Sequence, residues 1–221
     1  MKNYLYRNIA NITSLLGVLP LALLYLENSY GFILALILFN NIMDDLDGIL
    51  AAKLNIRSRF GADLDNVCDA VAHVAIALAV GVHFGGMSLI ASLIASAAII
   101  LRATSRLNPD CISGGSPTNE LMRHVFFVLL LSEVFSFNPQ VLLTLVFVLN
   151  TFSMSAPILM PTMIRSQAKT ASLVAMVNIA LVCAYLLPDI ALYIALVFFI
   201  TYLYALITGS RQWIKVWGAK Q

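Results

Sequence analysis

Charged residues are scarce in this sequence. Asp, Glu, Lys and Arg together make up 11% of its 221 residues, whereas hydrophobic residues make up 61%. Soluble domains carry about 25% charged residues, so this composition excludes an ordinary soluble domain and indicates an integral membrane protein. The formal net charge is only +2, and we expect no nucleic-acid partner.

Cysteine and long polar stretches are also lacking. Cys68, Cys111 and Cys183 are an odd number without paired spacing, which predicts neither a disulfide framework nor a zinc site. No stretch is polar enough to form a separate soluble module. We therefore expect a single membrane domain over residues 1–221.

What the sequence does contain is a series of apolar segments, separated by turn residues or polar connectors. There are about eight, at approximately Ile12–Leu26, Tyr30–Ala52, Ala62–His83, Ser88–Ala103, Pro117–Phe135, Pro139–Leu159, Ala171–Leu187 and Ile190–Ile207. No small-x-small cleavage site follows the first segment, so we interpret it as an uncleaved helix rather than a signal peptide. The predicted fold class is an all-α, polytopic helical bundle with about eight transmembrane helices.

The basic residues predict how this bundle is oriented. With eight spans, all thirteen Lys and Arg fall on one side of the membrane and none on the other. Lys and Arg accumulate on the cytoplasmic side of membrane proteins. We therefore expect a multi-pass protein of the cell membrane with both termini in the cytoplasm.

Six of the eleven acidic residues are concentrated between Asp44 and His73. Carboxylates at membrane depth are costly, which makes them candidates for a functional site. Positions i, i+3, i+4 and i+7 share one helix face, and here they are Asp44, Asp47, Gly48 and Ala51. A repeat of four residues defines a second face with Gly61, Asp65, Asp69 and His73.

The two faces are joined by a short basic connector, Lys53–Phe60, so we expect two antiparallel neighbouring helices. Their four carboxylates would then face a common space. Like charges this close require a cation, and oxygen-only ligands favour Mg²⁺ or Mn²⁺, with room for two ions.

The position of Asp44 predicts how this space is reached. It lies nine residues before Lys53, a rise of about 14 Å along a helix, which indicates a cavity open to the cytoplasm. Gly48, Ala51 and Gly61 leave room on the same faces for a phosphate-bearing ligand. Small residues also allow close helix packing, which is the alternative interpretation.

These residues resemble the signature of the CDP-alcohol phosphatidyltransferases. That signature is Asp, two residues, Asp-Gly, two residues, Ala-Arg, about eight residues, Gly, three residues, Asp, three residues, Asp. The chain matches it over residues 44–69, at Asp44, Asp47, Gly48, Ala51, Gly61, Asp65 and Asp69. It departs at Ala52, where the family has Arg. Asn11 and Thr13 resemble a polar pair of the family's first helix, or alternatively cap that helix.

The resemblance implies a magnesium- or manganese-dependent transferase of phospholipid biosynthesis that works as a homodimer in the lipid bilayer. It implies these metal ligands: Asp44, Asp47, Asp65 and Asp69, the last acting also as the catalytic base. It implies these CDP-binding residues: Asp44, Asp47, Gly48, Ala51, Gly61 and Asp65.

Three segments look like the phosphatidylserine synthase branch of this family. Arg59–Asp65 resembles its SxFGAxLD run, Leu101–Asn108 its LRLARFN segment, and Gly115–Thr118 the stretch that follows. This likeness implies L-serine as the acceptor, CDP-diacylglycerol or CDP-archaeol as the donor, and CMP as a product. Glycerol phosphate, inositol phosphate and choline remain alternative acceptors.

Basic residues at the expected rim are candidates for anion binding. Arg59, Arg102 and Arg106 would attract a diphosphate or an acceptor carboxylate. Arg57 is interpreted instead as reaching toward lipid headgroups.

Three further residues of the acidic stretch receive other interpretations. Asp45 and Asp63 point away from the two carboxylate faces, as supporting or solvated residues. His73 is interpreted as a packing residue.

Two other classes of membrane protein use intramembrane acids. Asn40 and Asn41 ahead of Asp44 hint at the NDxxD pattern of aromatic prenyltransferases, but no second acidic motif follows Asp69. An ion transporter would carry acids at matching depths in two repeats, whereas the fifth to eighth apolar segments carry only Glu120 and Glu133 near their ends.

Overall fold

The computed structural model describes residues 2–26, 29–108, 117–156, 164 and 170–218, and within these ranges the chain is all-helical, without strands. Its helices are α1 (Lys2–Val18), η1 (Leu19–Tyr25), η2 (Ser29–Phe32), α2 (Ile33–Lys53), α3 (Arg59–Phe84), α4 (Gly86–Leu107), α5 (Pro117–Phe135), α6 (Gln140–Ser155), α8 (Ala171–Leu186) and α9 (Pro188–Gly218). Each predicted apolar segment overlaps one of the α-helices, and the predicted end of the sixth segment, 157–159, lies outside the described residues.

Four helical stretches of the described chain are long and apolar enough to cross a membrane: Leu5–Tyr25, Arg59–Phe84, Gly86–Leu107 and Pro188–Ile214. Helices α6 and α8 are apolar but shorter. The prediction of a multi-pass helical membrane protein is therefore supported.

The first apolar segment differs from its predicted form. The α-helix starts at Lys2 and ends at Val18, and a 3₁₀ helix continues to Tyr25 with Pro20 in its first turn. Proline lacks the backbone N–H and clashes with the carbonyl four residues earlier, so α-helical bonding cannot continue through it. Asn11 and Thr13 lie in the interior of α1, so neither caps it; the Thr13 hydroxyl donates to the Ile9 carbonyl over 2.9 Å.

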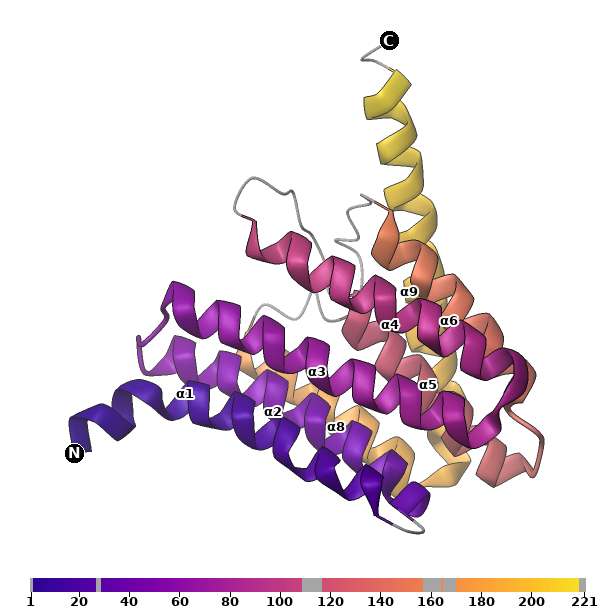
Figure 1. Cartoon of the computed structure of the whole chain (residues 1–221), viewed down its shortest axis with the longest axis horizontal. Helices are drawn as coiled ribbons and strands as arrows, with labels where there is room; N and C mark the ends of the chain where they lie inside the picture. The colour runs from indigo at the N-terminus through magenta and orange to yellow at the C-terminus, as the bar shows by residue number, and fades with distance from the viewer. Residues whose placement is uncertain (1, 27–28, 109–116, 157–163, 165–169, 219–221) are drawn as a thin grey trace.

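Helices α1, α2 and α3 lie side by side, and the connector from α2 to α3 is at the same end of the bundle as the N-terminus (Figure 1). This confirms α2 and α3 as antiparallel neighbours. Helix α3 packs along α4, which in turn packs along α6, whereas α5 and α8 both contact α9. The C-terminal end of α9 projects out of the bundle (Figure 1).

Close approach of α3 and α4 depends on a glycine. A Cβ placed on Gly81 would lie 1.9 Å from the Ser92 hydroxyl and 2.6 Å from its Cβ. Helix α4, which also packs along α6, buries the small residues Ala91, Ala95 and Ala98 as well. Small side chains therefore let these two helices pack tightly, as they do in other membrane bundles.

Candidate active site

Three of the four predicted carboxylates converge between α2 and α3. Asp44 and Asp47 from α2 and Asp65 from α3 each offer a carboxylate oxygen, and these oxygens lie within 4.8 Å of one another. A set of carboxylate oxygens at this spacing fits a hard divalent cation such as Mg²⁺ or Mn²⁺. Asp69, one turn further along α3, lies outside this group.

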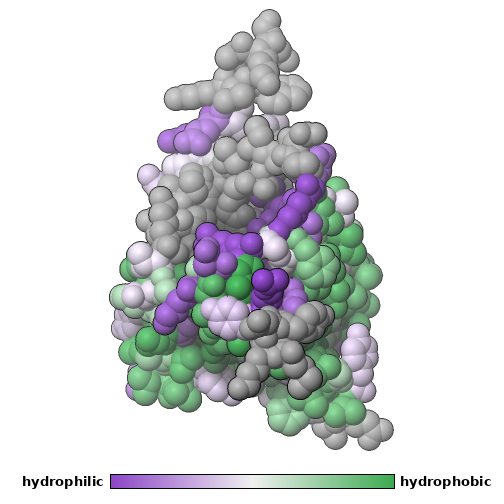
Figure 2. All heavy atoms as spheres, turned by 90° about the vertical axis from the view of Figure 1, so that its left-hand side faces the viewer, coloured by the Kyte–Doolittle hydropathy of each residue, from purple (hydrophilic) through white to green (hydrophobic). Residues whose placement is uncertain are grey.

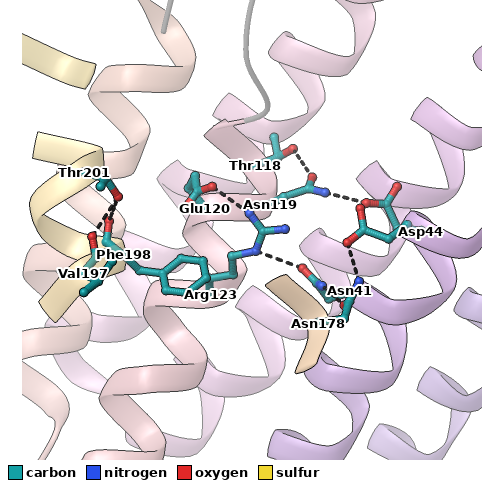
Figure 3. Close-up of polar contacts among 11 residues, drawn as sticks. Asn41, Asp44, Thr118, Asn119, Glu120, Arg123, Asn178, Val197, Phe198 and Thr201 are labelled. Atoms are coloured by element: carbon teal, nitrogen blue, oxygen red, sulfur yellow. Dashed lines mark hydrogen bonds and ion pairs between the residues drawn. The ribbon is translucent and has the colours of Figure 1, made fainter. Parts of the chain in front are cut away.

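Side chains from other helices hold two of these carboxylates. The Ser14 hydroxyl on α1 donates a hydrogen bond to Oδ2 of Asp47. The Asn119 amide on α5 donates to Oδ2 of Asp44 over 2.6 Å (Figure 3). The site therefore depends on helices on both sides of the motif.

A cavity of about 210 Å³ opens beside the carboxylates, between α1, α2, α3 and the α2–α3 connector. It is lined by Arg7, Ala10, Asn11, Ser14, Asp47, Gly48, Ala51, Ile56, Arg57, Ser58, Gly61, Ala62 and Asp65. Hydrophilic side chains gather on this end of the molecule, above a largely hydrophobic surface (Figure 2).

The two motif glycines serve this cavity differently. A Cβ on Gly48 would meet no atom within 4 Å, so this glycine leaves open space. A Cβ on Gly61 would lie 3.0 Å from Asn11 Oδ1 and 3.2 Å from the Ser58 hydroxyl, which caps α3. Gly61 therefore allows α1 and the start of α3 to approach closely.

The cations at the cavity are not the ones that we selected from the sequence. Arg7 and Arg57 line it, although Arg57 was assigned to lipid headgroups. Arg59 does not line it, and its Nε lies 3.8 Å from Oδ2 of Asp63, with both side chains exposed. Ala52, at the family's Arg position, is exposed and does not line the cavity.

Asp69 belongs to a second, smaller hollow between α3, α4 and the start of α5. It shares this space of about 10 Å³ with Arg102 and Arg106 from α4 and with Thr118 from α5. Arg102 is buried and Arg106 is exposed. The hollow has room for about one water molecule.

Three further residues of the acidic region can now be placed. Asp45 is 1% exposed and accepts a 2.8 Å hydrogen bond from Asn178 on α8, so it is a supporting residue and not a solvated one. Of Asp45 and Asp63, Asp63 is the one whose side chain is exposed to solvent. His73 is buried, as expected of a packing residue.

Several residues at the site were not predicted. Arg7 and Ser14 line the cavity from the same face of α1 as Asn11, at i, i+7 and i+4, and this polar stripe is visible in the sequence. Asn11 itself was noted for its resemblance to a polar residue of the family's first helix. Asn119 and Asn178 come from helices far along the chain, and no local pattern distinguishes them.

The chain belongs to the CDP-alcohol phosphatidyltransferase family, because the sequence model of that family matches residues 7–201. A protein of Aquifex aeolicus (strain VF5), named only as an uncharacterized protein, is 39% identical over 80 residues. The match covers 34% of this chain and 39% of that relative, so the chain spans about two fifths of its relative's length. Family membership favours the phosphatidyltransferase interpretation over a prenyltransferase or an ion transporter.

Proposed function

We propose that this protein is a metal-dependent phosphatidyltransferase of phospholipid biosynthesis, which transfers the phosphatidyl or archaetidyl group of a CDP-lipid to a polar alcohol and releases CMP. The observation that carries the proposal is the convergence of Asp44, Asp47 and Asp65 beside an open polar cavity, within the region that matches the family.

Each part of the cavity has a role in binding the nucleotide. Asp44, Asp47 and Asp65 would hold Mg²⁺ or Mn²⁺, which would supply positive charge to the diphosphate and to the leaving CMP. Gly48, Ala51 and Gly61 keep the adjoining wall short enough for the nucleotide to approach. Arg7 and Arg57 contribute positive charge at the same cavity, which suits phosphate groups.

Asp69 is the proposed general base and contributes to metal binding from one turn away. A carboxylate there takes the proton of the acceptor hydroxyl as that oxygen attacks the donor phosphorus. Its neighbours Arg102 and Arg106 suit an acceptor that carries its own carboxylate, and L-serine is such an alcohol. Glycerol phosphate, inositol phosphate and choline are the alternatives to be tested.

We further propose a single domain with eight spans, both termini in the cytoplasm and the site open to the cytoplasm, in a homodimer. The support is the overlap of the eight described α-helices with the eight apolar segments, together with the one-sided placement of Lys and Arg. Tags at residues 1, 113 and 221 should all report cytoplasmic. One external report would refute the eight-span arrangement.

The test of function is release of CMP from radiolabelled CDP-diacylglycerol or CDP-archaeol by the purified protein. We expect release on addition of L-serine, loss of release with a chelator, and recovery with Mg²⁺ or Mn²⁺. Release with another alcohol but not with serine would reassign the acceptor. No release with any of the four acceptors, or full activity after exhaustive chelation, would contradict the proposal.

A further inference from the structure

The first two turns of α5 carry an unusual number of buried polar side chains. The exposed fractions are 7% for Thr118, 4% for Asn119, 2% for Glu120 and 1% for Arg123. Burying a polar group without a hydrogen bond is costly, and burying a charge costs more still. The hydrogen bonds of these side chains form two branches (Figure 3). One branch ends on Asp44 and the other on Asp45, and both of these carboxylates belong to α2.

The first branch is direct. The Asn119 amide nitrogen donates to Oδ2 of Asp44 over 2.6 Å, and the Asn119 oxygen accepts from the Thr118 hydroxyl over 3.3 Å. A hydrogen bond from a buried amide to a carboxylate is charge-assisted and strongly directional. Asn119 therefore sets the orientation of a carboxylate that faces Asp47 and Asp65.

The second branch begins at Arg123, which is paired with Glu120 over 2.7 Å and lies 5.8 Å from the Phe198 ring. Its Nε donates to the Asn41 oxygen over 3.1 Å. Arg has no acceptor atom, so Asn41 must present its oxygen here and its NH₂ group on the other side.

That NH₂ group orients the rest of the branch. It donates to the Asn178 oxygen over 2.8 Å, and the Asn178 NH₂ group donates to Oδ2 of Asp45 over 2.8 Å. The polarity of two amides in series is thus set by one guanidinium. The branch joins α5, α2 and α8 and ends next to Asp44 in the chain.

We propose that α5 is the positioning helix of the carboxylate site. Asn119 orients Asp44 directly, and the branch from Arg123 fixes the rotation of α2. Asp44 and Asp47 lie on one face of α2, and consecutive residues of a helix are about 100° apart around its axis. A rotation of α2 by less than one residue would therefore turn both carboxylates away from α3. This inference rests on the proposed function insofar as it assumes that these carboxylates bind a cation.

The first test is Mn²⁺ binding by the full-length protein, measured by electron paramagnetic resonance without substrate. Asn119→Leu removes the donor at similar volume, and loss of a partner that orients a metal ligand weakens metal affinity by about 10–100-fold. The matched control is Asn150→Leu, the same substitution at a fully buried position of α6 whose amide contacts His124 and the Val146 carbonyl.

We expect the control to bind Mn²⁺ like the unmodified protein. Equal weakening in both variants would indicate general loosening of the bundle and would overturn the proposal. Unchanged affinity in Asn119→Leu would overturn it as well.

A kinetic measurement separates positioning from substrate contact. If Asn119 acts through Asp44, the Asn119→Leu variant needs more Mn²⁺ for half-maximal CMP release, yet saturating Mn²⁺ restores kcat and leaves the KM for the CDP-lipid unchanged. A raised KM that saturating Mn²⁺ does not correct would place Asn119 against the substrate and refute the positioning role.

The Arg123 branch is tested with charge-neutral variants, because removing one member of a buried ion pair leaves the other uncompensated. Arg123→Met combined with Glu120→Gln removes both charges, and Asn178→Leu interrupts the branch without touching a charge. We expect both to weaken Mn²⁺ binding less than Asn119→Leu does. Affinity equal to the unmodified protein in Asn178→Leu would remove this branch from the proposal.

Failure of this inference differs from failure of the proposed function. Release of CMP by an enzyme whose Asn119→Leu variant binds Mn²⁺ normally refutes positioning and leaves the function intact. Mn²⁺ binding that depends on Asn119, without CMP release from any CDP-lipid, refutes the function and leaves positioning intact. Absence of Mn²⁺ binding by the unmodified protein overturns both.

Discussion

Two hollows of similar size lie in different parts of this molecule and differ in their lining. The hollow between α1, α2 and α3 measures about 210 Å³ and is lined by arginines, carboxylates, small residues and hydroxyl groups. The hollow between α5, α6 and α9 measures about 260 Å³ and is lined by eleven apolar residues and His124. Volume alone does not distinguish a site from a packing feature.

The difference lies in what each hollow requires. In a bilayer, hydrocarbon chains can fill an apolar hollow without loss, whereas buried polar groups need polar partners. The polar hollow is also lined by Asp47 and Asp65, which lie close to Asp44, and these carboxylates repel one another unless a cation joins them. We therefore expect substitutions at the first hollow to change ligand binding and substitutions at the second to change only stability.

The largest effect is expected for the two acids of α3, which should behave differently from each other. Asp69→Asn cannot accept a proton, and loss of a general base lowers turnover by about 10²–10⁴-fold. CDP affinity should change far less, since Asp44, Asp47 and Asp65 still form the oxygen cluster. Asp65→Asn should lower both turnover and CDP affinity, because its proposed role is ligation.

Both variants are compared by CMP release and by equilibrium binding of CDP. Equal loss of CDP affinity would mean that Asp69 is only another ligand, and the base would have to be another residue. Normal turnover in Asp69→Asn would exclude it as the base altogether.

The contrast between the hollows also shows what the sequence could predict. The positions of the helices follow from hydropathy, because each apolar segment must satisfy its backbone internally. The convergence of Asp44, Asp47 and Asp65 follows from helical spacing and a short connector. The place of Asp69 in a separate hollow does not follow, because it depends on how α4 and α5 pack against α3.

Other features of the site depend on tertiary contacts between distant residues. Asn119 lies 75 residues from Asp44 and Asn178 lies 133 residues from Asp45, and no local pattern predicts these pairs. Arg123 is one of the thirteen basic residues that the eight-span prediction puts on one side of the membrane, yet it is buried beside Glu120. Charge patterning predicts the side of the membrane and not the depth of a residue.

The second prediction fills the polar hollow. Gly48→Leu adds a side chain where an added Cβ meets no atom within 4 Å, so the helix should fold normally. The space for the nucleotide is lost, and even one misplaced methylene in a binding pocket costs about 10–200-fold. We expect CDP affinity to fall by at least that lower bound.

Gly31→Leu is the matched control for this prediction. Gly31 also has no atom within 4 Å of an added Cβ, but it lies in η2, away from the carboxylates. It should bind CDP like the unmodified protein. Normal CDP binding by Gly48→Leu would show that the nucleotide does not occupy this cavity.

The third prediction concerns packing away from both hollows. Gly81→Ala forces a Cβ into Ser92, and overpacking a well-packed interior costs about 1–3 kcal/mol. The unfolding temperature should fall, while CMP release per folded molecule stays the same. Adding Ser92→Gly should recover part of the loss. An unchanged unfolding temperature would mean that α3 and α4 can separate at this point without cost.

The smallest effect is expected at the apolar hollow, where His124 is the only polar residue among the described residues that line it. Its Nδ1 lies 3.3 Å from the Asn150 amide nitrogen, which also donates to the Val146 carbonyl over 2.9 Å. His124→Leu leaves one amide hydrogen of Asn150 without its acceptor, at a cost of about 1 kcal/mol, the lower end for a buried unsatisfied group. Adding Asn150→Leu removes both partners, and such paired replacements are nearly neutral.

The double variant should therefore unfold close to the temperature of the unmodified protein, and both variants should release CMP at the normal rate. A tenfold or greater loss of turnover in the double variant would show that the apolar hollow takes part in the reaction and would end the distinction between the two.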